Sequence, residues 1–184
     1  STPKRTLEKR LRRIGEALRV AVPQLKDLKL TTDEGGAPHL RGLYEHWRPN
    51  AGWQSEDQFS DGTLRLFGLL WVFMDGRSPL LLEEPELSLH RAVIRHMPSM
   101  LAGIARRLDR QVIVSTHSAD LLADEGIAGE EVLLLIPTKE ATKVSVAAAD
   151  LQIRALLESG MPVGEAVFPR TAPKDAYQLA LFGE

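Results

Sequence analysis

Two adjacent carboxylates and a histidine follow two short apolar runs of this sequence. Glu83 and Glu84 come directly after Leu80–Leu82, and His117 closely follows Gln111–Ser115. At a strand end, one carboxylate can hold a divalent cation such as Mg²⁺ through oxygen, while the other orients or deprotonates an attacking water. A histidine nearby could contact the charge that develops on a phosphoryl group. The residue types therefore favour an active-site edge that hydrolyses a phosphoryl bond.

A purely structural explanation exists for the same carboxylates. Acidic side chains favour the amino end of a helix through its dipole, and Pro85 is suited to a first helical turn. For a single glutamate this explanation is the better one. The run Leu-Leu-Leu-Glu-Glu-Pro-Glu, followed further along the chain by Ser-Thr-His-Ser, favours the functional interpretation.

A third segment with chemical potential is Phe-Ser-Asp-Gly-Thr, which precedes an apolar stretch expected to be helical. Ser60 and Asp61 are good helix N-cap residues, and Gly62 would let a phosphate approach the backbone closely. The free N–H groups of a helix amino end form an anion site. By itself, an ordinary capped helix explains the segment equally well. Arg65 could be a phosphate contact or a surface charge, and the sequence leaves both open.

The elements that must position these residues alternate between helix and strand. Alternation of this kind predicts an α/β fold with a largely parallel sheet flanked by helices, preceded by an N-terminal antiparallel hairpin. Parallel strands place their carboxyl ends at one sheet edge, so Glu83, Glu84 and His117 are expected to converge there. We expect helices at residues 3–22, 64–74, 86–108 (bent near Pro98), 119–123 and 151–158, strands at residues 25–32, 40–47, 80–82, 111–115, 131–136 and 143–147, and a Pro- and Gly-rich tail from residue 162.

Length and composition limit the function classes. The 184 residues predict one domain, made of a basic helix (1–23), a hairpin and loop (24–58), a motif-bearing core (59–160) and a tail (161–184). A net charge of -2 argues against a surface wholly devoted to binding polyanions. For the first helix, a solvated basic face is favoured over a DNA-facing helix or a coiled-coil arm. The absence of cysteine excludes disulfides and thiolate zinc sites. No apolar run reaches the roughly 18–20 residues of a membrane span, so we expect a cytoplasmic protein without membrane contact.

Together the three segments resemble the C-terminal half of an ABC-type ATPase, in the branch of RecF-like, SMC-like and overcoming-lysogenization-defect (OLD) proteins and predicted AAA-type ATPases. The resemblance implies ATP and Mg²⁺ as cofactors and a homodimer formed through ATP. It places Glu83 at the Mg²⁺-associated position of the Walker B strand, Glu84 at the catalytic-base position and His117 at the γ-phosphate-sensing position. The signature motif, which contacts the nucleotide held by the opposite subunit, would comprise Ser60, Asp61, Gly62 and Arg65.

One family element is absent from the sequence. The phosphate-binding loop requires a Gly-Lys dipeptide, and none occurs in the chain. We therefore expect a C-terminal lobe that is inactive alone and hydrolyses ATP at a dimer interface once joined to a P-loop-bearing N-terminal lobe. Family analogy suggests a DNA-related or defence-related process. The alternative is a non-catalytic interaction module that retains the cassette fold.

Two further partners follow from the C-terminal part of the chain. The acidic residues there are scattered, so we expect no nuclease within this chain, and a DNA or nuclease effector would be a separate partner. The segment Gln178–Phe182 resembles the short peptide with which replication proteins bind the sliding clamp. A tail that packs its apolar residues on its own domain is the favoured alternative.

Overall fold

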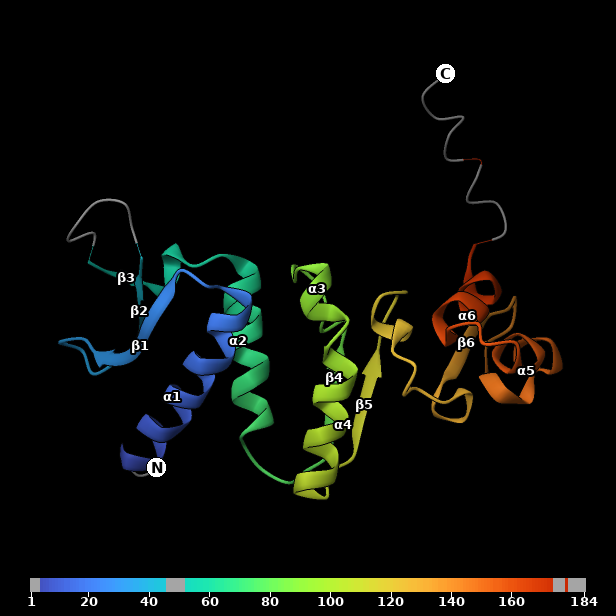
Figure 1. Cartoon of the computed structure of the whole chain (residues 1–184), viewed down its shortest axis with the longest axis horizontal. Helices are drawn as coiled ribbons and strands as arrows, with labels where there is room; N and C mark the ends of the chain where they lie inside the picture. The colour runs from blue at the N-terminus through green and yellow to red at the C-terminus, as the bar shows by residue number, and fades with distance from the viewer. Residues whose placement is uncertain (1–3, 46–51, 174–177, 179–184) are drawn as a thin grey trace. The chain divides into compact units, whose positions relative to one another are not determined.

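The computed structural model describes residues 4–45, 52–173 and 178 (Figure 1). The chain forms two compact units. The first comprises residues 1–93 and 104–115, and the second comprises residues 94–103 and 116–184. The clamp-like segment lies outside the described residues except for Gln178. Among the described helices, none has the length and apolar composition needed to cross a bilayer.

The first unit begins with an amphipathic helix packed against a small antiparallel sheet. Helix α1 (Lys4–Ala21) buries Leu11, Ile14 and Leu18, one side of a 3.6-residue period, and contacts β1 and α2. The predicted hairpin is confirmed by the antiparallel pairing of β1 (Leu25–Thr32) with β2 (Pro38–Tyr44). A third strand, β3 (Trp53–Ser55), pairs with β2. Its short length explains why this strand could not be recognised from periodicity.

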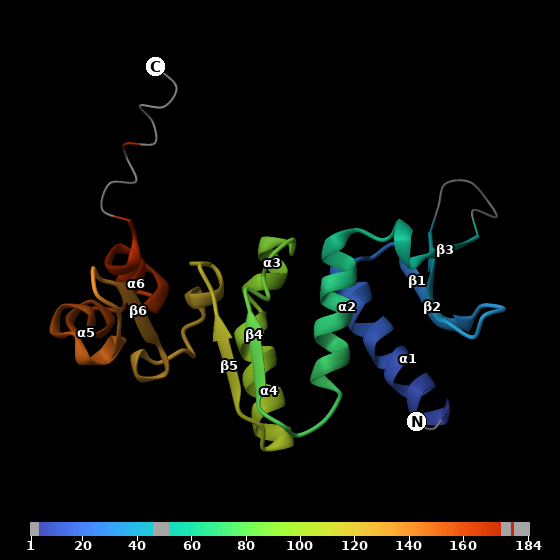
Figure 2. The same ribbon diagram turned by 180° about the vertical axis from the view of Figure 1, so that it is seen from behind.

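A parallel strand pair carries the two adjacent carboxylates. Helix α2 (Asp61–Phe73) leads through a loop into β4 (Leu80–Glu83), which pairs in parallel with β5 (Val112–Ser115). Figure 2 shows these two strands side by side. The predicted parallel pairing of these two strands is thus confirmed. Within the described residues, however, the other two sheets are antiparallel, so the expected largely parallel sheet is limited to this pair.

The long helix expected at residues 86–108 is wrong. A turn follows β4, and two separate helices follow the turn, α3 (Arg91–Ile94) and α4 (Met97–Leu108). The turn is incompatible with a helix because Ser88 has a φ of 62°, in the left-handed region. Pro98 is the second residue of α4, where its missing N–H costs no helical hydrogen bond.

The second unit has its own core around an antiparallel hairpin. Strands β6 (Leu133–Pro137) and β7 (Thr142–Val146) are joined by a short turn, which requires antiparallel pairing. Two helices contribute to this core, α5 (Leu151–Glu158) and α6 (Val163–Thr171). The buried residues of this core are Leu134, Ala147, Ile153, Val163, Ala166 and Val167.

Helix α6 corrects the prediction of a Pro- and Gly-rich tail from residue 162. Val163, Ala166 and Val167 are all buried, at the i, i+3 and i+4 spacing of one helix face. Gly164 supports close packing, because a Cβ there would lie 3.0 Å from the Cβ of Leu122. Pro169 lies near the C-terminal end of α6, where it removes few helical hydrogen bonds.

A buried arginine fixes the loop between α2 and β4. Arg110 is only 8% exposed, and its Nη1 donates hydrogen bonds to the carbonyl oxygens of Val72 (3.0 Å) and Asp75 (3.1 Å). Its Nε donates to the carbonyl oxygen of Ser78. The carbonyls at a helix C-terminus lack intrahelical partners, so one side chain satisfies both the end of α2 and the entry to β4.

Replacing this arginine should destabilise the first unit. We expect Arg110→Ala to lower the free energy of unfolding by about 1–3 kcal/mol, because three carbonyl groups lose their charged donor and a buried side chain is removed. Arg77→Ala, in the exposed part of the same loop, should stay within about 0.5 kcal/mol of the wild type. Urea denaturation followed by circular dichroism measures both values. Equal losses in the two variants would contradict this role of Arg110.

Candidate functional site

The two adjacent carboxylates lie at the carboxyl end of β4. Glu83 is the last residue of the strand, is exposed and lies opposite Ser115 in the parallel register. The N–H of Glu84 donates to the carbonyl oxygen of Ser115 at 2.9 Å. Glu84 has a φ of 40°, in a region that costs a non-glycine residue about 1–3 kcal/mol. A strained backbone of this kind persists only where surrounding contacts hold it, so the contacts of Glu84 matter.

Arg65 is one of the residues that hold this backbone. Its Nη2 donates to the carbonyl oxygen of Glu84 at 2.6 Å and lies 3.4 Å from that of Glu83. The N–H of Leu87 donates to the same Glu84 oxygen at 3.2 Å. The sequence left Arg65 as either a phosphate contact or a surface charge. The structure adds a contact within the chain that neither alternative included.

The amino end of α2 forms the second part of the site. Ser60 is the N-cap, as predicted, and its Oγ accepts a hydrogen bond from the N–H of Thr63 at 3.2 Å. Asp61 is the first helical residue and is exposed. A Cβ built on Gly62 would lie 2.4 Å from the carbonyl oxygen of Ser88. The first turn of α2 therefore touches the turn that follows β4, and the signature-like residues lie beside the strand end that bears the carboxylates.

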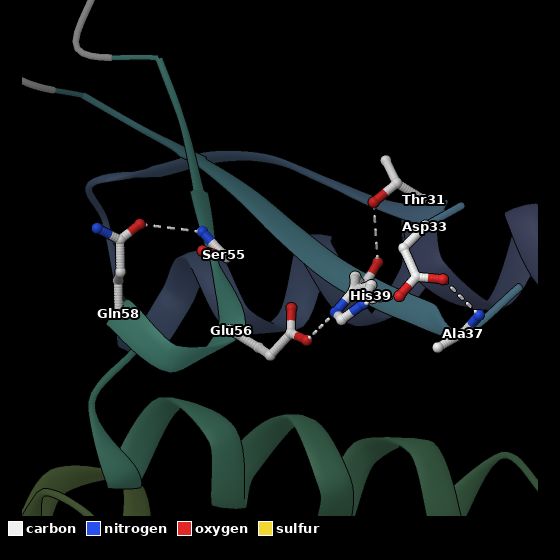
Figure 3. A network of polar contacts seen from close by, with 7 residues as sticks. All are labelled: Thr31, Asp33, Ala37, His39, Ser55, Glu56 and Gln58. Atoms are coloured by element: carbon white, nitrogen blue, oxygen red, sulfur yellow. Dashed lines mark hydrogen bonds and ion pairs between the residues drawn. The ribbon is translucent and has the colours of Figure 1, made fainter. Parts of the chain in front are cut away.

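A network of polar contacts holds the segment that leads into this helix (Figure 3). His39 on β2 lies between two carboxylates, with its Nδ1 2.6 Å from Glu56 Oε1 and its Nε2 3.3 Å from Asp33 Oδ2. Glu56 begins the 3₁₀ turn η1 (Glu56–Gln58), which is followed by Phe59 and the N-cap Ser60. Further hydrogen bonds link Thr31 to His39, Asp33 to Ala37 and Ser55 to Gln58.

The network shifts the protonation of its members. The hydrogen bond to Glu56, and secondarily that to Asp33, raises the pKa of His39 above 6.5. The hydrogen bond from His39 lowers the pKa of Glu56, and the N–H of Ala37 is the main cause that lowers the pKa of Asp33. The sequence did not indicate this cluster, because Glu56 lies 17 residues from His39, outside the hairpin that carries Asp33 and His39. No periodic pattern or motif connects them.

His117 belongs to the second unit and closely follows the end of β5. It is exposed. Next to it, the N–H of Ser118 donates to Thr116 Oγ1 at 2.9 Å, and the N–H of Leu121 donates to Ser118 Oγ at 3.3 Å. These bonds define the local turn that carries the histidine. The convergence of His117 with Glu84 at one sheet edge stays a prediction.

The donor set fits a cation that takes only part of its coordination from protein. Among the described residues, no cluster of three or more His, Asp or Glu side chains is arranged to hold a metal ion. Mg²⁺ commonly takes one or two carboxylates and completes its octahedron with phosphate oxygens and water. The exposed carboxylate of Glu83 could supply one such ligand.

Comparisons with known proteins identify a family and a fold. Residues 4–124 match the family model described as "AAA domain, putative AbiEii toxin, Type IV TA system". Among curated proteins, no relative matches the sequence. A solved structure from work on ATP-driven dimerization and DNA-stimulated activation of SMC ATPases superposes with a TM-score of 0.58 at 16% identity, covering 85% of this chain and 94% of that chain.

Two SMC head structures agree with the same fold. A head bound to the C-winged helix domain of ScpA gives a TM-score of 0.56 at 17% identity, with 77% of this chain and 43% of that chain covered. A head with an extended coiled coil, bound to the C-terminal domain of ScpA and derived from Pyrococcus furiosus, gives 0.58 at 16% identity, with 85% and 39% covered. This chain thus spans less than half of these two relatives and has the fold of an SMC ATPase head.

Alanine substitutions at two glycines of α2 test the contact between this helix and the turn after β4. Gly62→Ala should cost about 1–3 kcal/mol of unfolding free energy, because its Cβ would collide with the Ser88 carbonyl. Gly68→Ala is a matched control in the same helix, where a Cβ meets nothing within 4 Å. It should stabilise the protein by about 0.4–1 kcal/mol. Thermal and urea unfolding measure both, and the same sign in the two variants would contradict the contact.

The histidine cluster predicts a pH dependence with a definite sign. The folded pKa of His39 lies above its unfolded value, so the contribution of His39 to stability is fully present below its unfolded pKa while Glu56 and Asp33 remain ionised. This contribution is lost as the pH rises through the folded pKa. We expect NMR titration of the His39 ring to give a pKa above 6.5, and Glu56→Gln to lower it. Glu34→Gln, in the exposed turn beside Asp33, is the control, and an unchanged His39 pKa in Glu56→Gln would refute the assignment.

Proposed function

The chain belongs to the AAA-domain family described as putative AbiEii toxin, Type IV TA system, and we propose a function from this membership. The chain is one lobe of a P-loop ATPase of the SMC and RecF type, and this lobe carries the catalytic carboxylate. In this proposal ATP is hydrolysed at a dimer interface once the lobe is joined to a second, P-loop-bearing lobe. That second lobe comes either from the same polypeptide or from a separate chain. The output would be a DNA-related or defence-related process.

The observation that carries the proposal is an uncovered apolar face on the strand pair that ends in the carboxylates. Leu81 on β4 is 72% exposed and Ile113 on β5 is 49% exposed, and the two are direct partners in the parallel register. On the other face, Leu80 is buried. Parallel strands are normally covered on both faces, and sheets usually have more than two strands. The exposed face therefore fits a missing part of the same sheet and its covering elements.

The sequence supports a P-loop lobe as the occupant of this face. A P-loop ATPase needs a phosphate loop, and no Gly-Lys dipeptide occurs in this chain. A lobe that covers the pair β4–β5 would bring its own strands next to Glu83 and Glu84. Both halves of one active site would then meet at the carboxyl edge of a single sheet.

Each candidate residue has a role in the assembled enzyme. Glu83 would offer one oxygen ligand to Mg²⁺, and Glu84 would orient or deprotonate the attacking water. His117 would contact the γ-phosphate of ATP. The amino end of α2 would contact the nucleotide held by the opposite subunit through Ser60, Asp61 and Gly62.

The comparisons also support the dimer and the biological process, within this proposal. The SMC ATPases of one matching structure are described by ATP-driven dimerization and DNA-stimulated activation. A homodimer formed through ATP would place the amino end of α2 against the partner's nucleotide. The toxin–antitoxin description of the family supports a defence-related output. An effector acting on DNA, such as a nuclease, would then be a separate partner.

Turnover in the assembled ATPase tests the proposal. The chain alone should not hydrolyse ATP, whereas the chain joined to its P-loop lobe should release phosphate at a measurable rate. Glu84→Gln in that assembly should lower kcat by about 10²–10⁴-fold, the range for loss of a general base, while ATP binding is retained. Phosphate release and equilibrium ATP binding measure the two effects.

A matched control separates the base from any acidic residue. Glu158→Gln, exposed in α5, should leave both turnover and ATP binding unchanged. Ordinary hydrolysis by the isolated chain would show that no second lobe is required. Unchanged turnover in Glu84→Gln would remove this residue from the base role and favour a non-catalytic interaction module that keeps the fold.

A further inference from the structure

Arg65 connects the two segments that the proposed function assigns to different nucleotide sites. It lies on α2, whose amino end would contact the nucleotide of the opposite subunit. Its guanidinium bonds to the backbone of Glu84, which would act on the nucleotide of its own subunit. We infer that Arg65 is a positioning residue that sets the backbone of Glu84 and couples the two sites of the dimer. This inference rests on the proposed function.

The first argument concerns the conformation of Glu84. Its φ of 40° places the residue in a region that nothing in its own chemistry favours. Its N–H is held by the Ser115 carbonyl at 2.9 Å, and its carbonyl oxygen is held by Arg65 at 2.6 Å and by the Leu87 N–H at 3.2 Å. Contacts on both peptide groups fix the backbone dihedrals and therefore the direction of the Cα–Cβ bond. The direction in which the Glu84 carboxylate leaves the backbone thus depends on Arg65.

The second argument concerns the rigidity of the connection. Helix α2 meets the segment after β4 at two points, Gly62 against the Ser88 carbonyl and Arg65 against the Glu84 carbonyl. The first contact has no room for even one added carbon atom, because a Cβ on Gly62 would lie 2.4 Å from the oxygen. A shift of the helix end on binding the opposite nucleotide would therefore press on the turn that follows Glu84 or pull on its carbonyl through Arg65. Nucleotide binding at one site of the dimer would thus change the position of Glu84 at the other site.

A direct phosphate contact by Arg65 is the competing role. The planar guanidinium suits phosphate, and because Nη2 donates to the Glu84 carbonyl in this structure, a phosphate contact would use the other N–H groups of Arg65. The two roles make opposite statements about which subunit's reaction depends on Arg65. A positioning residue serves the base of its own subunit, and a phosphate contact serves the nucleotide of the other.

The positioning contact can be tested on this chain without any activity. We expect Arg65→Ala to speed amide hydrogen exchange at Glu84 and Leu87 by roughly 10-fold, the size of effect from losing one charged hydrogen bond. Arg65→Lys, which keeps one donor, should restore part of the protection. Arg12→Ala, on the exposed face of α1, is the control and should change neither amide. NMR-detected exchange resolves the residues, and unchanged exchange in Arg65→Ala would overturn the positioning role.

Mixed dimers of the assembled ATPase test which subunit's reaction depends on Arg65. With Arg65→Ala and Glu84→Gln on the same subunit, the other subunit keeps an intact base, and about half of the wild-type turnover should remain if positioning acts within one chain. With the two changes on opposite subunits, turnover should be nearly lost. The reverse pattern would overturn the inference and establish a phosphate contact. In homodimers, Arg65→Ala should lower kcat and leave the KM for ATP unchanged.

The two experiments separate failure of the inference from failure of the proposed function. An assembly of wild-type lobes without ATP turnover would refute the proposed function and, with it, the catalytic coupling. The exchange measurement would still decide whether Arg65 positions the Glu84 backbone. Normal turnover together with unchanged exchange in Arg65→Ala would leave the proposed function intact and refute the inference alone.

Discussion

The close approach of Gly62 to the carbonyl oxygen of Ser88 is the constraint on which the arrangement of the site depends. A side chain at residue 62 would lie inside the van der Waals radius of that oxygen, so the amino end of α2 could not reach the turn after β4. Without that approach, the guanidinium of Arg65 would not reach the carbonyl of Glu84. The strained Glu84 backbone would then lose a partner that offsets its cost. One absent side chain thus allows two segments to act as a single unit.

Much of the fold was accessible from the sequence because its signals are local. The apolar period of α1, the strand–turn–strand pattern of β1 and β2, and the N-cap Ser60 each depend on residues within a few positions of one another. The parallel pairing of β4 with β5 followed from the general rule for strand–helix–strand units. The position of Glu83 and Glu84 at a strand end was predictable from the apolar run that precedes them.

The parts that the sequence did not predict depend on contacts between distant residues. Arg65 bonds to a backbone carbonyl, and any residue type presents such a group, so no pattern of side chains indicates the partner. The cluster around His39 joins the β1–β2 hairpin to Glu56, and no motif connects the two. The single helix expected at residues 86–108 does not form, because tertiary packing favours a turn after β4 over helical propensity. Ser88 in this turn has the left-handed backbone conformation. Helix α6 was missed because Pro169 and Gly164 obscured the buried face of this helix.

In the proposed enzyme, the carboxylates and the phosphate loop belong to different lobes, and this division affects how ATP hydrolysis is controlled. The backbone of Glu84 and the amino end of α2 are held by contacts within this chain, so in the proposed enzyme they would be in place before a second lobe binds. Assembly then needs to supply only the phosphate cradle and the cover for Leu81 and Ile113. Burial of that apolar pair would favour the lobe interface without involving the catalytic side chains. In the proposed enzyme, assembly would therefore switch hydrolysis on while the backbone that carries the carboxylates stays in place.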